Sequence, residues 1–180
     1  SDLPDLGNLE QLYRMKGAAE LDATDQPVVQ AVWYLLNYAF ENRASDIHIE
    51  PKREESLVRM RIDGVLHRIH RLPKLVHPAM VSRVKMLARM DIAERRRPQD
   101  GRFKTHHGGD EVEMRVSTVP TAFGEKVVMR IFDPGIYVKN VDSMGLFQRE
   151  RMLLERMLST KAGMVLVTGP TGSGKTTTLY

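Results

Sequence analysis

The antiparallel sheet predicted for this protein rests on one stretch, Leu57–Ile69, which reads LVRMRIDGVLHRI. Asp63 and Gly64 stand between two runs in which apolar and polar residues alternate, and Asp-Gly is the strongest short signal for a two-residue hairpin turn. One face of this hairpin is apolar and holds Val58, Met60, Ile62, Val65 and Ile69. The opposite face is basic and holds Arg59, Arg61 and Arg68 together with Leu57, Leu66 and His70. The residues alone leave open whether these arginines are merely solvated or face an anion.

A second strand and a helix are predicted upstream of the hairpin. Strict alternation over Ala44–Pro51 places Ile47 and Ile49 on one face and the polar residues Asp46, His48 and Glu50 on the other. Three such side chains resemble a metal ligand set, but alternation by itself turns polar residues outward, so we expect a solvated face and no metal. Before this strand, Asp25 is the predicted cap of a helix whose apolar part, Val28–Phe40, should be buried on most sides.

Another helix and three more strands are predicted downstream. The range Leu75–Ile92 is amphipathic, with an apolar stripe that excludes Arg83, Lys85 and Arg89. A polar connection, Glu94–Arg102, follows; its Pro and Asp-Gly signal turns, and its basic run reads as a solvated loop. The predicted strands are Phe103–His107, Glu111–Val119 and Lys126–Phe132. Residues 25–133 are therefore predicted to form an α+β domain with helices packed against one sheet.

A phosphate-binding loop is predicted near the end of the chain. The sequence GPTGSGKT at Gly169–Thr176 fills every fixed position of GxxxxGK(S/T). It follows Met164–Thr168, a short apolar run typical of a buried parallel strand, and it leads into helix-tolerant residues. This strand, loop and helix context indicates a nucleotide site, that is, a Walker A motif.

Each residue type of this loop suits the chemistry of a triphosphate. The glycines permit backbone N–H groups to wrap the phosphates, and the helix that begins there directs its positive dipole end at the anion. Lys175 places a charge near the outer phosphates, Thr176 offers its hydroxyl to Mg²⁺, and Thr177 reaches the inner phosphate. The predicted nucleotide-binding residues of the loop are Gly169, Thr171, Gly172, Ser173, Gly174, Lys175, Thr176 and Thr177.

Hydrolysis in this class of protein also needs a metal-binding acid on a second strand and a residue that positions water. We find neither in the sequence, and Lys175 is the one catalytic candidate. We therefore expect a fragment of a longer ATPase that is inactive by itself.

Composition narrows the class of protein. The chain is 42% hydrophobic and 28% charged, as in ordinary globular proteins, no run in it approaches a membrane span, and its first residues lack the basic-then-apolar pattern of a signal sequence. We expect a soluble, unexported chain. The absence of cysteine excludes disulfides and thiolate metal sites and suits a reducing cytoplasm. The net charge of +4 is spread over interleaved acids and bases, and aromatic residues make up only 6%, which argues against nucleic acid as the partner.

Six motifs, taken in order, resemble one family. They are Ala44–Glu50, Arg61–Gly64, Pro98–Arg102, Arg115–Thr118, Gly124–Arg130 and Gly169–Tyr180. Together they are similar to the type II secretion and type IV pilus assembly ATPases, a group of secretion-superfamily ATPases, from about residue 25 to the end of the chain.

The resemblance implies a domain organisation. Residues 25–133 would form a PAS-like N-terminal module, 134–142 a linker, and 143–180 the first part of a RecA-like ATPase domain. The helical spacing of apolar residues over Ser143–Leu158 separately predicts a helix there. Residues 1–24 read as a linker or docking segment with a short helix at Asn8–Ala19.

The resemblance also implies a function. Such proteins are cytoplasmic homo-hexamers that hydrolyse ATP with Mg²⁺, and they dock on platform proteins of the inner membrane to power type II secretion or type IV pilus assembly. The motifs do not separate these two subfamilies. Basic residues of the N-terminal module reach over the nucleotide in this family: Arg59 and Lys74 match those positions, and Arg61 is a neighbouring candidate. Lys74 stands where arginine is usual and so lacks the bidentate fork.

Two alternatives from other classes remain at this point. A nucleic-acid-dependent P-loop motor would explain the basic composition, and an assembly module would explain a chain without catalytic acids. Salt-dependent binding of DNA or RNA would favour the first alternative, and nucleotide-independent self-association would favour the second.

Overall fold

A computed structural model of the chain describes residues 21–132, 145–170, 173 and 175–179. The chain divides into two compact units, Ser1–Phe132 and Asp133–Tyr180. The helix predicted at Asn8–Ala19 and the linker predicted at 134–142 lie outside the described residues. No helix in the described part of the chain combines the length and the apolar character needed to cross a membrane.

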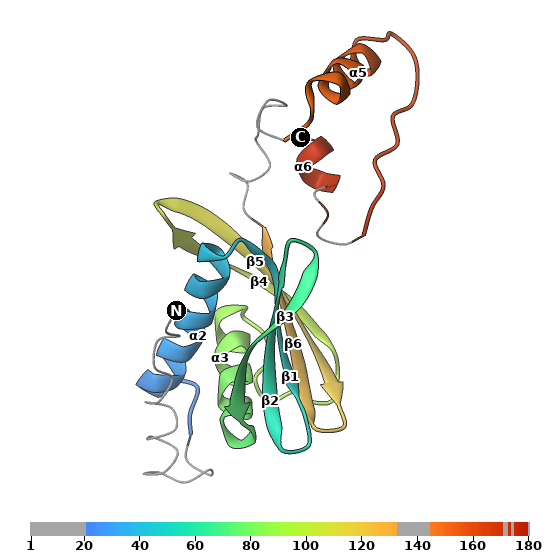
Figure 1. Cartoon of the computed structure of the whole chain (residues 1–180). Helices are drawn as coiled ribbons and strands as arrows, with labels where there is room; N and C mark the ends of the chain where they lie inside the picture. Colours follow the sequence, from blue (N-terminus) through green and yellow to red (C-terminus); the bar gives the residue numbers. More distant parts are fainter. Residues whose placement is uncertain (1–20, 133–144, 171–172, 174, 180) are drawn as a thin grey trace. The chain divides into compact units, whose positions relative to one another are not determined.

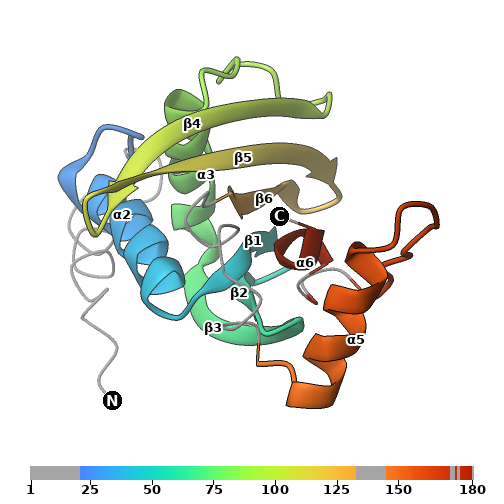
Figure 2. The ribbon, with the colours of Figure 1, turned by 90° about the horizontal axis from the view of Figure 1, so that it is seen from above.

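The first unit is built on one six-stranded sheet, in which all neighbouring strands are antiparallel. The strand order is β3-β2-β1-β6-β5-β4, with β3 and β4 at the two edges (Figure 2). The strands are β1 (Ala44–Pro51), β2 (Glu55–Ile62), β3 (Val65–Pro73), β4 (Gln99–His107), β5 (Asp110–Thr121) and β6 (Gly124–Phe132). A mixed fold of helices and an antiparallel sheet is thus confirmed.

The predicted hairpin is present as β2 and β3, joined by Asp63 and Gly64. These two residues have φ values of 50° and 82°, the left-handed conformation that a two-residue primed turn requires. The prediction for His70 is wrong. Arg68 pairs with Arg59 and His70 pairs with Val58, so Ile69 is an extra residue in a β-bulge, and the bulge moves His70 off the arginine face.

Two helices cover one face of the sheet (Figure 1). The first, α2 (Gln26–Glu41), has Asp25 at its N-cap position, but the Asp25 carboxylate accepts the N–H of Asp22 (3.0 Å) and makes no cap hydrogen bond. α2 is buried along one stripe rather than on most sides, because Trp33 is 47% exposed. The second helix, α3 (His77–Leu87), follows the short 3₁₀ helix η2 (Lys74–Val76).

α3 ends five residues before the predicted end at Ile92, because Arg89 takes a φ of 56° and closes the helix. Gly101, predicted to lie in a turn, is instead part of β4. A Cβ atom at Gly101 would lie 2.6 Å from the carbonyl oxygen of Ala88. Glycine at this position therefore allows β4 to pass close to the end of α3.

The core lies between the helices and the covered face of the sheet. Its fully buried side chains come from β1, β2, β5, β6, α2 and α3; they include Ile47, Ile49, Val58, Met60, Met114, Met129, Leu35, Leu36 and Met80. The alternation predicted for β1, β2 and β5 is therefore confirmed on this face. Neither helix covers the opposite face of the sheet (Figure 1).

The second unit contains two described helices, α5 (Gln148–Leu158) and α6 (Lys175–Leu179). α5 has no buried residue and begins where the Glu150 carboxylate accepts the N–H of Phe147 (3.1 Å). The predicted strand Met164–Thr168 is not formed in this structure. A strand exists through its ladder of hydrogen bonds, and none of the described residues pairs with this run, in which Met164 is 90% exposed.

Candidate functional site

The predicted phosphate-binding loop folds back on itself at the start of α6. The Lys175 ammonium group donates hydrogen bonds to the carbonyl oxygens of Gly169 (2.6 Å) and Pro170 (2.7 Å). The Ser173 hydroxyl donates to the same Pro170 oxygen (2.7 Å). A cation therefore lies inside the loop, held by groups that are at most six residues away in the sequence.

Gly169 lies close to the Ser173 side chain in this loop. A Cβ atom there would stand 2.6 Å from the Ser173 hydroxyl oxygen, which is closer than real Cβ contacts. The described residues thus place a cation beside the backbone of Gly169 and Pro170, and such a charge suits a phosphate group. Of the other predicted residues, Thr171, Gly172 and Gly174 lie outside the described part, and Thr176 and Thr177 are described only as backbone in α6.

The basic residues predicted to face a nucleotide lie in the first unit. Arg59 and Arg61 share the uncovered face of β2, as predicted: Arg59 Nη2 contacts Glu50 Oε1 (2.6 Å), and Arg61 Nη1 donates to the Gly64 carbonyl (2.8 Å). Lys74 lies in η2, beyond the end of β3 that is remote from the Asp63–Gly64 turn. Its ammonium group donates to the Arg53 carbonyl (2.8 Å), and it does not join Arg59 and Arg61.

Two acidic residues of β1 belong to this face and correct the prediction of a solvated surface. Asp46 and Glu50 are only 2% and 5% exposed. Glu50 contacts Arg59 (2.6 Å), Lys126 (3.1 Å) and Lys52 (3.4 Å). β1 is a central strand, so the long basic side chains of its neighbours β2 and β6 extend over its carboxylates.

The sequence holds a signal for this cluster. β1 and β2 are separated by only three residues, which predicts an antiparallel pair, and the pairing of His48 with Arg59 then places the acids and the arginines on the same face.

The basic neighbours change the pKa values of Glu50 and His48 on this face. Burial by itself would raise the pKa of Glu50, but the hydrogen bonds and charges of Arg59 and Lys126 outweigh it and lower the pKa to about 2. Burial, followed by the charge of Lys126, lowers the pKa of His48. Both ring nitrogens of His48 lack a hydrogen-bond partner within the described part of the chain. No group of three metal-binding side chains is found among the described residues.

A row of arginines crosses the same face. Arg102, Arg115 and Arg130 are direct cross-strand neighbours on β4, β5 and β6, and they line an open groove. Like charges placed opposite each other destabilise a sheet unless they are compensated. Asp46 contacts Arg130 (2.9 Å) and Arg61 (3.5 Å), which makes this buried carboxylate the link between the two halves of the face. Basic side chains therefore line this face from β2 across to β4.

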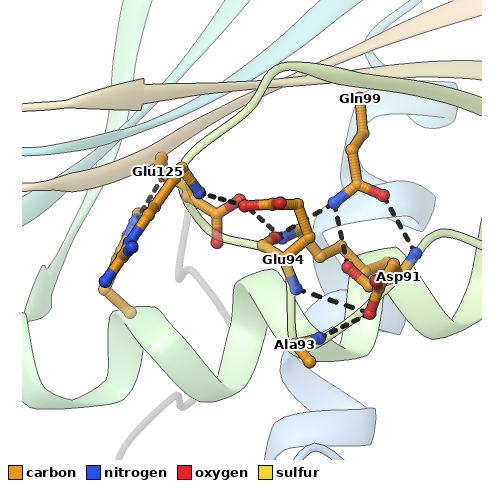
Figure 3. A network of polar contacts seen from close by, with 8 residues as sticks. Asp91, Ala93, Glu94, Gln99 and Glu125 are labelled. Atoms are coloured by element: carbon orange, nitrogen blue, oxygen red, sulfur yellow. Dashed lines mark hydrogen bonds and ion pairs between the residues drawn. The ribbon is translucent and has the colours of Figure 1, made fainter.

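A buried polar network was also missed by the sequence reasoning. Lys85, predicted to point away from the core, is 1% exposed and forms an ion pair with Glu125 (2.5 Å). It also donates to the Glu94 carbonyl (2.6 Å), in the network drawn in Figure 3. His77 Nε2 lies 2.7 Å from the Glu125 carbonyl, which only accepts, so Nε2 carries the proton and Nδ1 accepts from the Ser56 hydroxyl (2.7 Å). Burial lowers the pKa of His77, in agreement with a neutral ring.

Comparison with known proteins places these features in a family. A family model described as Type II/IV secretion system protein matches residues 22–180. The chain is 49% identical over 173 residues to the type IV pilus assembly ATPase TfpB of Acinetobacter baylyi, covering 96% of this chain and 30% of that protein. It is 45% identical over 156 residues to the type II secretion system protein E of Pseudomonas aeruginosa, covering 87% of this chain and 31% of that protein.

A solved structure supports the fold. The X-ray structure of the Yersinia pseudotuberculosis ATPase DotB matches with a TM-score of 0.53 and 16% identity, over 75% of this chain and 36% of that one. The chain spans about a third of the length of the curated relatives described above, which are covered to 30% and 31%. The family match over 22–180 confirms the resemblance of the six motifs: this chain belongs to the type II/IV secretion system protein family.

Proposed function

We propose that this chain is part of a cytoplasmic ATPase that powers type II secretion or type IV pilus assembly, and that Gly169–Thr177 binds the phosphates of ATP. The observation that carries the proposal is the position of Lys175, whose ammonium group donates to the backbone carbonyls of Gly169 and Pro170 at the start of the glycine-rich motif. The relatives of this chain include a protein named as a type IV pilus assembly ATPase, which supports the proposal that the chain is part of an ATPase.

The residues of the loop have different roles in binding ATP. Lys175 exchanges its contacts with the Gly169 and Pro170 carbonyls for contacts with phosphate oxygens, a stronger pairing because both groups are charged. Gly169, Thr171, Gly172, Ser173 and Gly174 supply backbone N–H groups, and Thr177 contacts an inner phosphate. Mg²⁺, held in part by the Thr176 hydroxyl, neutralises phosphate charge when it is bound.

In this proposal, Arg59 and Arg61 of the first unit assist at the nucleotide. Arg59 is engaged with Glu50, and turning toward a phosphate would leave a buried carboxylate without that partner. Glu50 is also paired with Lys126 (3.1 Å) and Lys52 (3.4 Å), so it stays compensated when Arg59 leaves. Arg59 is therefore free to alternate between two anions. The position of Lys74, on the Arg53 carbonyl, makes it the weaker candidate.

The proposed organisation follows the family. Residues 25–133 act as a PAS-like module, 134–142 as a linker, 143–180 as the first part of a RecA-like ATPase domain, and 1–24 as a linker or docking segment. The full-length protein assembles as a homo-hexamer that docks on platform proteins of the inner membrane. Hydrolysis requires acidic residues outside this stretch, so the chain by itself binds ATP without turnover.

Nucleotide binding to the full chain, measured by calorimetry with ATP and Mg²⁺, tests the loop. Lys175→Ala should weaken binding by about tenfold or more, because the outer phosphates lose their charge partner. Lys161→Ala is the matched control in the same unit and should leave the affinity unchanged. Equal affinities for wild type and Lys175→Ala would contradict the proposed site.

The role of Arg59 is tested separately in the full-length protein. Arg59→Ala should lower the rate of phosphate release and leave the melting temperature nearly unchanged, because Glu50 keeps two basic partners. Arg68→Ala, on the same face, should have the milder effect. An unchanged rate for Arg59→Ala would show that this arginine is a solvated surface residue.

A further inference from the structure

The connection between α3 and β4 carries three consecutive arginines, Arg95, Arg96 and Arg97. All three are exposed. None of them forms an ion pair with a carboxylate in the described part of the chain, whereas Arg59, Arg61, Arg71, Arg115 and Arg130 each do. This set of guanidinium groups, which we call the arginine triplet, has its hydrogen-bonding capacity available for another molecule.

Hydrogen bonds among Asp91, Ala93, Glu94 and Gln99 hold the backbone next to the triplet (Figure 3). Gln99 accepts the N–H of Asp91 (2.9 Å) and donates to the carbonyls of Asp91 (2.9 Å) and Glu94 (3.1 Å). The Asp91 carboxylate accepts the N–H of Ala93 (2.9 Å), and the Glu94 carboxylate accepts the N–H of Arg96 (2.6 Å). These contacts close the connection into a fixed loop, although it contains no helix or strand.

The second anchor of this loop is the buried ion pair. Lys85 donates to the Glu94 carbonyl (2.6 Å) and is paired with Glu125 on β6, so the residue before the triplet is tied to the interior of the unit. A solvated loop needs no such anchor. A loop that binds a partner gains from one, because fixing the backbone in advance removes entropy that would otherwise be lost on binding.

The surroundings indicate the kind of ligand. Guanidinium groups pair best with carboxylates or phosphates. Acidic residues flank the triplet on both sides, Asp91 and Glu94 before it and Asp100 after it, and an extended polyanion would meet these negative charges as well. Carboxylates that are spaced along a peptide can contact the arginines without placing a negative charge beside these acidic residues. Ile92 in the same loop is 38% exposed and offers an apolar contact, and arginine beside exposed apolar side chains is typical of protein interfaces.

We propose that the arginine triplet is a docking site for an acidic segment of a partner protein. The site lies outside the proposed nucleotide-binding residues, and the proposal does not depend on them.

The test uses the full chain and a fluorescein-labelled peptide in which three glutamates are separated by pairs of serines, with binding followed by fluorescence anisotropy at low salt. Arg95→Gln/Arg96→Gln/Arg97→Gln should weaken binding by about tenfold or more, through the loss of three charge-assisted contacts. The matched control, Arg53→Gln/Arg68→Gln/Arg71→Gln, removes the same charge from another surface of the first unit and should change the affinity less than about twofold. Equal losses in the two triple variants would overturn the proposal.

A second variant tests the fixed loop. Gln99→Ala keeps every arginine and removes three contacts within the loop, so binding should weaken several-fold while the melting temperature stays nearly unchanged. Wild-type affinity in this variant would show that the loop geometry has no role and would overturn the proposal. Duplex DNA and phosphatidylglycerol vesicles serve as phosphate probes. If either one bound more tightly than the peptide, and this binding were lost in the arginine-triplet variant, the proposed acidic protein partner would be wrong and the ligand would be a phosphate-bearing surface.

Discussion

The two units of this chain hold their shape in different ways. In the first unit, contacts join residues far apart in the sequence: Arg130 reaches Asp46, 84 residues away, and His77 reaches Glu125, 48 residues away. In the second unit, Lys175 closes its loop on carbonyls five and six residues away. None of the residues described in the second unit is buried, whereas the first unit has a continuous apolar core.

This difference separates two kinds of sequence information. The loop at Gly169–Lys175, which we propose as the nucleotide site, is a local sequence pattern, and its described hydrogen bonds join residues at most six apart. The six-stranded sheet carries stability, which depends on burial of apolar area brought together from many elements. A clear motif therefore says little about the stability of the region that contains it, and three experiments test this contrast.

The largest effect is expected for Lys85→Met, which leaves Glu125 as a buried charge without its partner. We expect a loss of about 3–5 kcal/mol in the free energy of unfolding of the first unit. Urea unfolding followed by fluorescence of Trp33, the only tryptophan, measures it. Lys161→Met in the second unit should leave the urea midpoint of this transition unchanged. In the double variant Lys85→Met/Glu125→Gln, part of the lost stability should return, because the buried negative charge is gone. If Lys85→Met did not destabilise the unit, the buried ion pair would be contradicted.

The same substitution in each unit sharpens the contrast. Leu35 is 1% exposed and Leu153 is 43% exposed. Leu35→Ala should destabilise the chain by about 2–5 kcal/mol because it leaves a cavity in the core. Leu153→Ala should change stability by less than about 0.5 kcal/mol. Urea unfolding followed by circular dichroism compares them, and equal losses would show that α5 belongs to a packed core.

The smallest effect concerns Glu50 and depends on pH. Its pKa is lowered to about 2 from the ordinary value of 4.5, so its ion pairs stabilise the fold fully above pH 4.5, and that contribution is lost as the pH falls through 2. Glu50→Gln should therefore be less stable than wild type at pH 7, and the gap should narrow steadily below pH 4.5. Melting temperatures measured from pH 7 to pH 3 test this, and a constant gap would show that the charge of Glu50 does not stabilise the sheet.

Several features of the protein follow from the sequence alone. The Asp63–Gly64 turn was predictable because both residues tolerate the left-handed conformation that the hairpin needs. The strand Ala44–Pro51 has the predicted bounds because its alternation has a period of two, and the family follows from six motifs in order. The turn depends on interactions within a few residues of the chain, and the alternation of the strand is enough to identify its apolar face.

Other features were decided only by the tertiary structure. Alternation identifies the face on which Asp46 and Glu50 lie but not what covers it, and the basic side chains that bury them come from strands β2 and β6. The bulge at Ile69, which moves His70 to the other face, leaves no trace in the alternation pattern. Lys85 stands outside the apolar stripe of its helix, yet it is buried because Glu125, 40 residues later, supplies the opposite charge. Burial of a charged group depends on a distant partner, and only the folded chain brings the two together.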